Sequence, residues 1–147
     1  MKTVPALLIV DDNPADVGLA REALARCAYR GQIDSAGDGI EAMAFLNRRE
    51  KYASAARPDL VLLDLNLPKK DGLAVLAGMK ANPDLRRIPV VIFSTSQLSK
   101  DITRSYELGA NCYVSKPGNL NDFFSAVKLI EEFWFGPVNL PPRGEQK

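Results

Sequence analysis

The sequence predicts an α/β protein built on a five-stranded parallel sheet, and three observations lead to this fold class. Apolar stretches of strand length recur along the chain, and the strongest are nearly continuous, as in strands that are buried on both faces. Segments with helical spacing of apolar residues alternate with them. Strict alternation of strand and helix is typical of a parallel sheet with right-handed crossovers and helices on both faces.

Five segments are expected to be strands. Three of them are strongly apolar, and two are weaker because polar residues interrupt them. In chain order they are Ala6–Val10, Gln32–Ala36 (weaker), Leu60–Leu63, Pro89–Phe93 and Cys112–Ser115 (weaker).

Five helices are expected to follow these strands. They are Pro14–Cys27, Gly39–Arg49, Gly72–Ala81, Lys100–Leu108 and Leu120–Trp134. Asn13 before Pro14 is typical of an N-cap with proline at the first helical position. Pairs that contain glycine or proline fall between the periodic segments, which supports these boundaries.

Two segments have no clear period. The polar, alanine-rich segment Arg48–Arg57 predicts either a helix extension or a loop. From Gly136 onward several prolines predict an extended or frayed tail. We therefore divide the chain into a domain of residues 1–135 and a proline-rich tail of residues 136–147.

Length and composition fit one globular domain. The chain has 147 residues, 46% of them hydrophobic and 25% charged, and domains most often have about 100–150 residues. A net charge of +1 argues against a broad polyanion-binding surface, so no nucleic-acid partner is expected. No apolar run reaches the ~18 residues of a membrane helix, and no cleavage site follows the first apolar stretch. We therefore expect no membrane association and a cytoplasmic location.

The residue inventory restricts the chemistry. The chain has no histidine, which excludes Ser-His and Cys-His catalysis and most zinc chemistry. Cys27 and Cys112 lie far apart in no metal-ligand spacing, which favours buried free thiols over a disulfide. Carboxylates, hydroxyls and lysines remain as the groups that could carry out chemistry.

Polar residues follow four of the predicted strands, at the edge where open parallel sheets bind ligands. Asp11 and Asp12 follow the first, Asp64 the central one, Ser94-Thr95-Ser96 close the fourth, and Lys116 follows the fifth. Singly, such residues are explained by capping or turns. Together, three carboxylates in one crevice repel each other unless a cation or a lysine compensates them. Oxygen ligands alone suit Mg²⁺, and an aspartate beside Mg²⁺ can accept a phosphoryl group.

These motifs, in this order and spacing, resemble the receiver domain of two-component response regulators over roughly residues 4–134. The matching segments are Leu8-Ile9-Val10-Asp11-Asp12-Asn13, Leu62-Leu63-Asp64-Leu65-Asn66-Leu67-Pro68 with Asp71-Gly72, Val91-Ile92-Phe93-Ser94, Tyr113 and Lys116-Pro117. The resemblance implies a flavodoxin-like doubly wound sheet with strand order 2-1-3-4-5.

The resemblance also implies a phosphoacceptor and a metal site. Asp64 would accept the phosphoryl group from a sensor histidine kinase. Asp12, Asp64 and the backbone carbonyl of Asn66 would bind Mg²⁺ directly, and Asp11 would act through water.

Further roles follow from the same resemblance. Lys116 would pair with the phosphoryl oxygens, Ser94 would donate its hydroxyl to another oxygen, and Thr95 would also belong to the phosphoryl-binding residues. Movement of Ser94 would let Tyr113 rotate from exposed to buried and remodel the nearby surface. The alternative for Tyr113 is a half-buried aromatic at the sheet edge with no switching role. Ser94 stands where the family more often has threonine, and Thr95 where it has a smaller residue.

The last predicted helix is unusually aromatic. Phe123, Val127, Ile130 and Trp134 share one helical face and are expected in the core. Phe124, Phe133 and Phe135 cannot all lie on that face. Such a patch predicts a homodimer through the fourth helix, fifth strand and fifth helix, with Phe124, Phe133, Trp134 and Phe135 at the interface. Alternatively, the proline-rich tail covers these aromatics.

Four shorter segments resemble the small response regulators that are paired with phytochrome-type histidine kinases. They are Glu132-Phe133-Trp134, Val138-Asn139-Leu140-Pro141, Asn66–Gly72 and Ser105-Tyr106-Glu107-Leu108. This implies a light-sensing kinase as phosphodonor and a stand-alone regulator whose output comes from the receiver surface.

Other classes fit less well or stay open. A haloacid-dehalogenase-like phosphatase needs a carboxylate two residues after its nucleophile, where Asn66 stands, so no enzyme of that kind is expected. A flavin carrier needs a glycine- and hydroxyl-rich loop where this chain has Asp11-Asp12-Asn13-Pro14. A phosphate sink, or a dimerisation or docking module without phosphorylation-driven output, shares every site residue and stays open.

Overall fold

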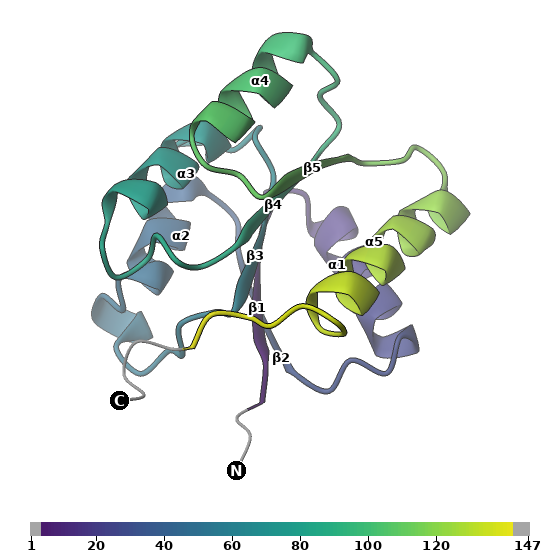
Figure 1. Ribbon diagram of the computed structural model, residues 1–147, viewed down its shortest axis with the longest axis horizontal. Helices are drawn as coiled ribbons and strands as arrows, with labels where there is room; N and C mark the ends of the chain where they lie inside the picture. Colours follow the sequence, from purple (N-terminus) through teal and green to yellow (C-terminus); the bar gives the residue numbers. More distant parts are fainter. Residues whose placement is uncertain (1–3, 143–147) are drawn as a thin grey trace.

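The computed structural model describes residues 4–142, which form a five-stranded parallel sheet between two helical layers (Figure 1). The strands are β1 (Ala6–Val10), β2 (Gln32–Ala36), β3 (Leu60–Leu63), β4 (Val90–Ser94) and β5 (Cys112–Ser115). They pair in the order β2-β1-β3-β4-β5, and every pair is parallel. The expected flavodoxin-like topology is confirmed.

The burial of each strand explains its sequence pattern. The inner strands β1, β3 and β4 are buried along their whole length, so both faces need apolar side chains. The edge strands β2 and β5 are more exposed and therefore contain polar residues. Strand β4 begins and ends one residue later than expected, because Ser94 still pairs with Ser115.

Five helices flank the sheet. They are α1 (Pro14–Arg26), α2 (Gly39–Leu46), α3 (Gly72–Ala81), α4 (Ser99–Glu107) and α5 (Leu120–Trp134). Helices α1 and α5 cover one face, and α2, α3 and α4 cover the other (Figure 1). The predicted cap is confirmed, since the Asn13 side chain accepts hydrogen bonds from the backbone N–H groups of Ala15 and Asp16.

Alternate strand residues build the two cores. Leu8, Val61 and Leu63 point to the layer of α2 and α3, whereas Leu7 and Leu62 point to the layer of α1 and α5. This two-residue period makes each inner strand contribute to both cores.

Helix α2 is shorter than the sequence predicted. It ends at Leu46, and Arg48 has a φ of 56°, a left-handed conformation that terminates helices. A 3-10 turn, η1 (Glu50–Tyr52), follows. The segment Arg48–Arg57 is thus a loop with one tight turn and does not extend the helix. Helix α1 ends at Arg26 and α4 runs one residue earlier than expected at both ends.

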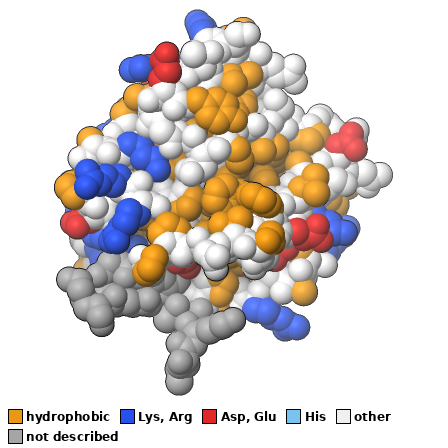
Figure 2. Space-filling model, in the orientation of Figure 1, with side chains coloured by type: hydrophobic (Ala, Val, Ile, Leu, Met, Phe, Trp, Pro, Cys, Tyr) orange, Lys and Arg blue, Asp and Glu red, His pale blue; other side chains and the backbone are white. Residues whose placement is uncertain are grey.

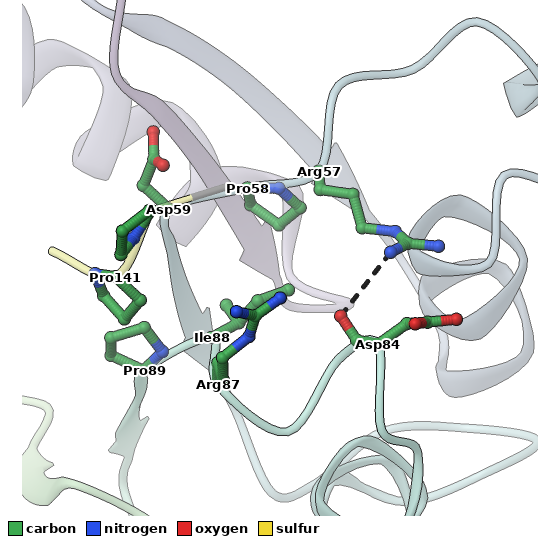
Figure 3. Close-up of a pocket in the computed structure, with 9 residues that line it drawn as sticks. Arg57, Pro58, Asp59, Asp84, Arg87, Ile88, Pro89 and Pro141 are labelled. Atoms are coloured by element: carbon green, nitrogen blue, oxygen red, sulfur yellow. Dashed lines mark hydrogen bonds between the residues drawn. The ribbon is translucent and has the colours of Figure 1, made fainter. Parts of the chain in front are cut away.

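After α5 the chain turns back across the amino end of the sheet (Figure 1). There Pro141 lies close to Asp59 and Pro89, which precede β3 and β4 (Figure 3). The described part of the tail is therefore extended and in contact with the domain. Residues 143–147 of the predicted tail lie outside the described residues.

The structure also bears on the expectations for the cysteines and for membrane-spanning helices. Cys27 and Cys112 are both free, as expected, but each is half-buried instead of fully buried. Among residues 4–142, no helix combines the length and apolar character needed to cross a membrane.

Candidate phosphoacceptor and metal site

The site lies at the carboxyl end of the sheet. Asp11 directly follows β1, and Asp64 directly follows the neighbouring strand β3, where its N–H donates to the Val10 carbonyl at 2.9 Å. Helix α3 starts against the Asp64 loop, since a Cβ on Gly72 would lie 2.2 Å from the Asp64 carbonyl oxygen. Only glycine fits at this close approach. The topology thus brings the predicted carboxylates together.

Lys116 connects the carboxylates from the loop between β5 and α5. Its Nζ lies 2.7 Å from Asp11 Oδ2, 2.9 Å from Asp16 Oδ2 and 3.0 Å from Asp64 Oδ2. The side chain of Lys116 is only 4% exposed. Lys116 therefore compensates two of the three carboxylates that the sequence singled out, Asp11 and Asp64, and a further one, Asp16.

Asp16 is a site residue that sequence reasoning missed. It lies in the first turn of α1, where an acidic residue is explained by the helix dipole. The available signal was its position one turn after β1, at the same edge of the sheet as Asp11. Nothing local to α1 indicated that Lys116, 100 positions away in the sequence, would reach it.

The donor set fits Mg²⁺, as expected from the sequence. Asp11, Asp12 and Asp64 each offer a carboxylate oxygen, and these three oxygens lie within 4.8 Å of one another. Asp12 is exposed, so the group opens to solvent on one side. Oxygen ligands from a few carboxylates, with room for water, are what Mg²⁺ prefers. Asn66 is exposed beside the site, and its N–H donates to Asp64 Oδ1 at 3.3 Å.

Burial and pairing shift two pKa values in the site. Burial raises the pKa of Asp11 above its ordinary value, and hydrogen bonds from Lys116 and the Asn13 N–H offset only part of that rise. Burial alone would lower the pKa of Lys116, but its bonds to Asp11, Asp16 and Asp64 outweigh this effect and raise it. Lys116 therefore remains a cation.

The end of β4 supplies hydroxyl groups on the next strand. Ser94 is fully buried, and its Oγ accepts a hydrogen bond from the Ser96 N–H at 3.2 Å. Thr95 is exposed at the mouth of this edge. Ser96 in turn donates its hydroxyl to Asp101 of α4 at 2.6 Å. The loop after β4 is thus tied to the start of α4.

Tyr113 is half-buried, and its hydroxyl donates to the Ser96 carbonyl at 2.7 Å. Its own N–H donates to the Tyr106 hydroxyl at 3.1 Å. These contacts connect β5 to both the loop after β4 and helix α4. The contacts of Tyr106 and Ser96 with Tyr113 were not predicted, because each runs through a backbone group that carries no sequence signature.

The aromatic residues of α5 separate into two groups. Phe123, Val127 and Ile130 are buried as expected, and Trp134 is half-buried. Phe124 lies 4.6 Å below the Arg26 guanidinium, and the ring of Phe135 lies 5.0 Å from that of Tyr29. Both pack toward α1 and its loop. Phe133 is 55% exposed.

Apolar side chains gather on the face formed by α4, β5 and α5 (Figure 2). The exposed members are Tyr106, Leu129 and Phe133, and half-buried Cys112 and Val114 of β5 lie between the helices. We call these five residues the α4-β5-α5 patch. An apolar patch of this kind is typical of interaction surfaces.

Comparison with known proteins places this site in a family. Residues 7–128 match the response regulator receiver domain. The response regulator Rcp1 of Synechocystis sp. (strain ATCC 27184 / PCC 6803 / Kazusa) is 49% identical over 135 residues, 92% of this chain and 92% of Rcp1.

Solved structures agree with this match. The phosphorylated cyanobacterial phytochrome response regulator RcpA is 50% identical, with a TM-score of 0.92 over 95% of this chain and 100% of RcpA. The Mn²⁺-bound form of Rcp1 is 48% identical, with a TM-score of 0.90 over 94% of this chain and 99% of that chain. The bacteriophytochrome response regulator AtBRR is 40% identical, with a TM-score of 0.74 over 96% of this chain and 100% of AtBRR. With its acidic pocket, lysine and strand order, this chain belongs to the response regulator receiver domain family of two-component signal transduction.

Proposed function

We propose that Asp64 accepts a phosphoryl group from a sensor histidine kinase of the phytochrome type. The observation that carries this proposal is the convergence of Asp64 with Asp11 on one buried lysine, Lys116, at the carboxyl end of the sheet. In the transfer, a carboxylate oxygen of Asp64 attacks phosphorus, the new P–O bond forms as the P–N bond of phosphohistidine breaks, and the imidazole leaves with the electron pair. The protein is then a phosphoacceptor that assists its own phosphorylation and dephosphorylation.

The residues that would hold Mg²⁺ are Asp12, Asp64 and the carbonyl of Asn66, with Asp11 acting through water. When bound, Mg²⁺ neutralises the charge that builds up on the transferred phosphoryl group. Asp11 and Asp64 already share Lys116, so they are oriented toward the same point. Their proximity is supported by the short distances between their oxygens and those of Asp12.

The phosphoryl oxygens would be bound by Lys116 and Ser94. Lys116 supplies a permanent cation, and Ser94 uses its oxygen to accept from Ser96, so its hydroxyl proton is available for a phosphoryl oxygen. Thr95 stands exposed at the mouth, where its bulk would restrict access to Asp64.

The switch would run from Ser94 to the α4-β5-α5 patch. Ser96 bonds Ser94 through its N–H and Tyr113 through its carbonyl. Movement of Ser94 toward the phosphoryl group would therefore shift the group that holds the Tyr113 hydroxyl. Tyr113 in turn bonds Tyr106 of the patch, so the change would reach that surface.

The identity of the kinase is supported by the relatives. RcpA and AtBRR are phytochrome and bacteriophytochrome response regulators, and both align with nearly the whole of this chain. We propose that transfer from the phosphohistidine of such a kinase takes place in the cytoplasm.

The direct test is phosphorylation in solution. Purified protein is incubated with Mg²⁺ and acetyl phosphate, and its intact mass is recorded. We expect the gain of one phosphoryl group by the wild type and by Asp84→Asn, a control at an exposed aspartate at the other end of the sheet. We expect no gain by Asp64→Asn or without Mg²⁺. A gain by Asp64→Asn would contradict Asp64 as acceptor, and no gain by the wild type would leave the docking module as the better account.

We further propose a homodimer through α4, β5 and α5. Of the four aromatics first considered, Phe133 and Trp134 support this interface best, because Phe124 and Phe135 pack toward α1. Phe133 and Leu129 are 55% and 66% exposed, and both belong to the α4-β5-α5 patch, whereas an isolated exposed apolar residue would carry no such meaning.

Analytical ultracentrifugation tests the dimer. We expect Phe133→Glu to shift the protein toward monomer, whereas Ile40→Glu, on the exposed side of α2 with 56% exposure, leaves the dimer population unchanged. Equal behaviour of the two variants would refute this interface. Phosphorylation that changes the dimer population would favour the switch, and an unchanged population would favour the sink.

The chain divides into a receiver domain and a tail at the end of α5. We propose that residues 1–135 are the receiver and that residues 136–147 form a tail whose described part lies along the amino end of the sheet.

A further inference from the structure

We propose that Asp16 competes with the phosphoryl group for Lys116 and thereby sets how tightly the site holds that group. This rests on the proposed function, in which Lys116 pairs with phosphoryl oxygens. Asp16 acts through Lys116 and is therefore a positioning residue.

The hydrogen-bond capacity of Lys116 carries the argument. A lysine ammonium has three N–H donors and no acceptor. Its Nζ already contacts three carboxylates, Asp11, Asp16 and Asp64, at 2.7, 2.9 and 3.0 Å. A phosphoryl oxygen that takes one of these donors must displace a carboxylate.

Asp16 is the carboxylate that can leave at the lowest cost. Its side chain is 24% exposed, against 7% for Asp11 and 9% for Asp64, so water can solvate it after release. It also lies in the first turn of α1, where the helix dipole stabilises a negative charge. Asp11 has neither advantage, and Asp64 carries the phosphoryl group itself.

The backbone holds Asp16 close enough to rebind. The Asn13 side chain accepts from the Asp16 N–H at 3.2 Å, and Pro14 sets the first helical position. Asp16 therefore stays within reach of Lys116 after the phosphoryl group departs. The contact also joins α1 to the loop between β5 and α5, and its two residues, Asp16 and Lys116, are 100 positions apart in the sequence.

The test measures equilibrium binding of beryllium fluoride, a mimic of the phosphoryl group, at saturating Mg²⁺ by ¹⁹F NMR. We expect Asp16→Asn to bind it about three- to tenfold more tightly, because a neutral amide is a weaker partner for Lys116 than a carboxylate. Asp16→Glu, which keeps the charge, should return the affinity toward that of the wild type.

Asp122→Asn is the matched control. Asp122 is an exposed aspartate in the first turn of α5, the helix that follows the Lys116 loop, and it bonds Asn119. Its substitution removes the same charge near the same edge, and we expect a change below about twofold. Thermal unfolding of each variant in the same buffer checks that it is folded.

The outcomes are distinct. Unchanged or weaker binding by Asp16→Asn would overturn the competition, and so would an equal gain in Asp122→Asn, which would indicate general electrostatics. Failure of the wild type to bind beryllium fluoride would instead overturn the proposed function.

Discussion

The two ends of the sheet differ in how they use polar groups. At the carboxyl end, four charged side chains form one partly buried cluster. At the amino end, the connecting loops bury leucine and proline, and their polar groups form hydrogen bonds with other groups of the protein. At the carboxyl end, Asp11, Asp16 and Asp64 share the single cation Lys116, so negative charge is in excess. This excess favours the binding of a further cation, and it lowers the stability of the folded protein when no cation is bound.

The amino end shows the opposite use of polar groups. Asp59 accepts a hydrogen bond from the buried Ala6 N–H at 2.9 Å, and Arg57 donates to the Leu46 carbonyl. Arg57 also donates to the Asp84 carbonyl (Figure 3). Lys80 donates to the carbonyls of Arg86 and Ile88, each at 3.1 Å. These groups are satisfied without a ligand. The loops at the amino end of the sheet therefore stabilise the fold, whereas the charged side chains at the carboxyl end are placed to bind a ligand.

The largest expected effect is a loss of stability when the core near the amino end of the sheet is disrupted. Leu85 is fully buried in the connection between α3 and β4. Leu85→Ala should lower the free energy of unfolding by about 2–5 kcal/mol through lost burial and a cavity. Urea unfolding measures this loss, and Mg²⁺ titration should find the affinity of the folded protein within about twofold of the wild type.

Leu98→Ala is its control at the carboxyl end, because Leu98 is 57% exposed. We expect a change of less than about 0.5 kcal/mol. Equal losses in the two variants would remove the contrast between the ends.

Asp59→Ala should have the next largest effect. It leaves the N–H of Ala6, a residue that is 3% exposed, without its carboxylate partner, at a cost of about 1–3 kcal/mol. Asp59→Asn keeps an acceptor oxygen and should lose less. Chemical denaturation of both variants checks this order, and a larger loss for the asparagine variant would contradict it.

Asp64→Asn should stabilise the metal-free protein, unlike the two destabilising variants above. In metal-free buffer we expect it to raise the free energy of unfolding by about 1 kcal/mol, because it removes one of the carboxylates that compete for Lys116. At Mg²⁺ near 100 times its Kd the wild type should gain about 2.7 kcal/mol and the variant less. Thermal unfolding with and without Mg²⁺ measures both, and a destabilised metal-free variant would refute the excess of negative charge.

The smallest effect is on pH dependence. Burial raises the pKa of Asp11, so the folded protein binds this proton more tightly than the unfolded chain does. Without metal, the contribution of Asp11 to the free energy of unfolding therefore rises as the pH falls through that pKa.

Mg²⁺ requires the deprotonated form, so its Kd should rise as the pH falls, at most about tenfold per pH unit for one proton. Isothermal titration between pH 7 and pH 3.8 measures this. An affinity that stays flat down to the ordinary aspartate value of 3.8 would contradict the raised pKa.

Two parts of the fold illustrate how far local patterns reach. Inner strands such as β1 and β3 were predicted with their observed bounds, because burial on both faces demands a continuous apolar run. Helix α2 was predicted too long, since the left-handed turn at Arg48 has no glycine or proline to mark it.

The sequence by itself determined the parallel sheet and the central site residues Asp11, Asp64 and Lys116, because the hydrophobic period marks the strands and ligands bind at the carboxyl ends of parallel strands. The order of the strands came only from the resemblance to receiver domains. The tertiary structure alone decided that Asp16 joins Lys116, that Tyr113 bonds Ser96, and that the tail returns to the amino end of the sheet. Each of these depends on the distance between elements far apart in the chain. Such distances are set by the packing of the whole domain, which no local segment encodes.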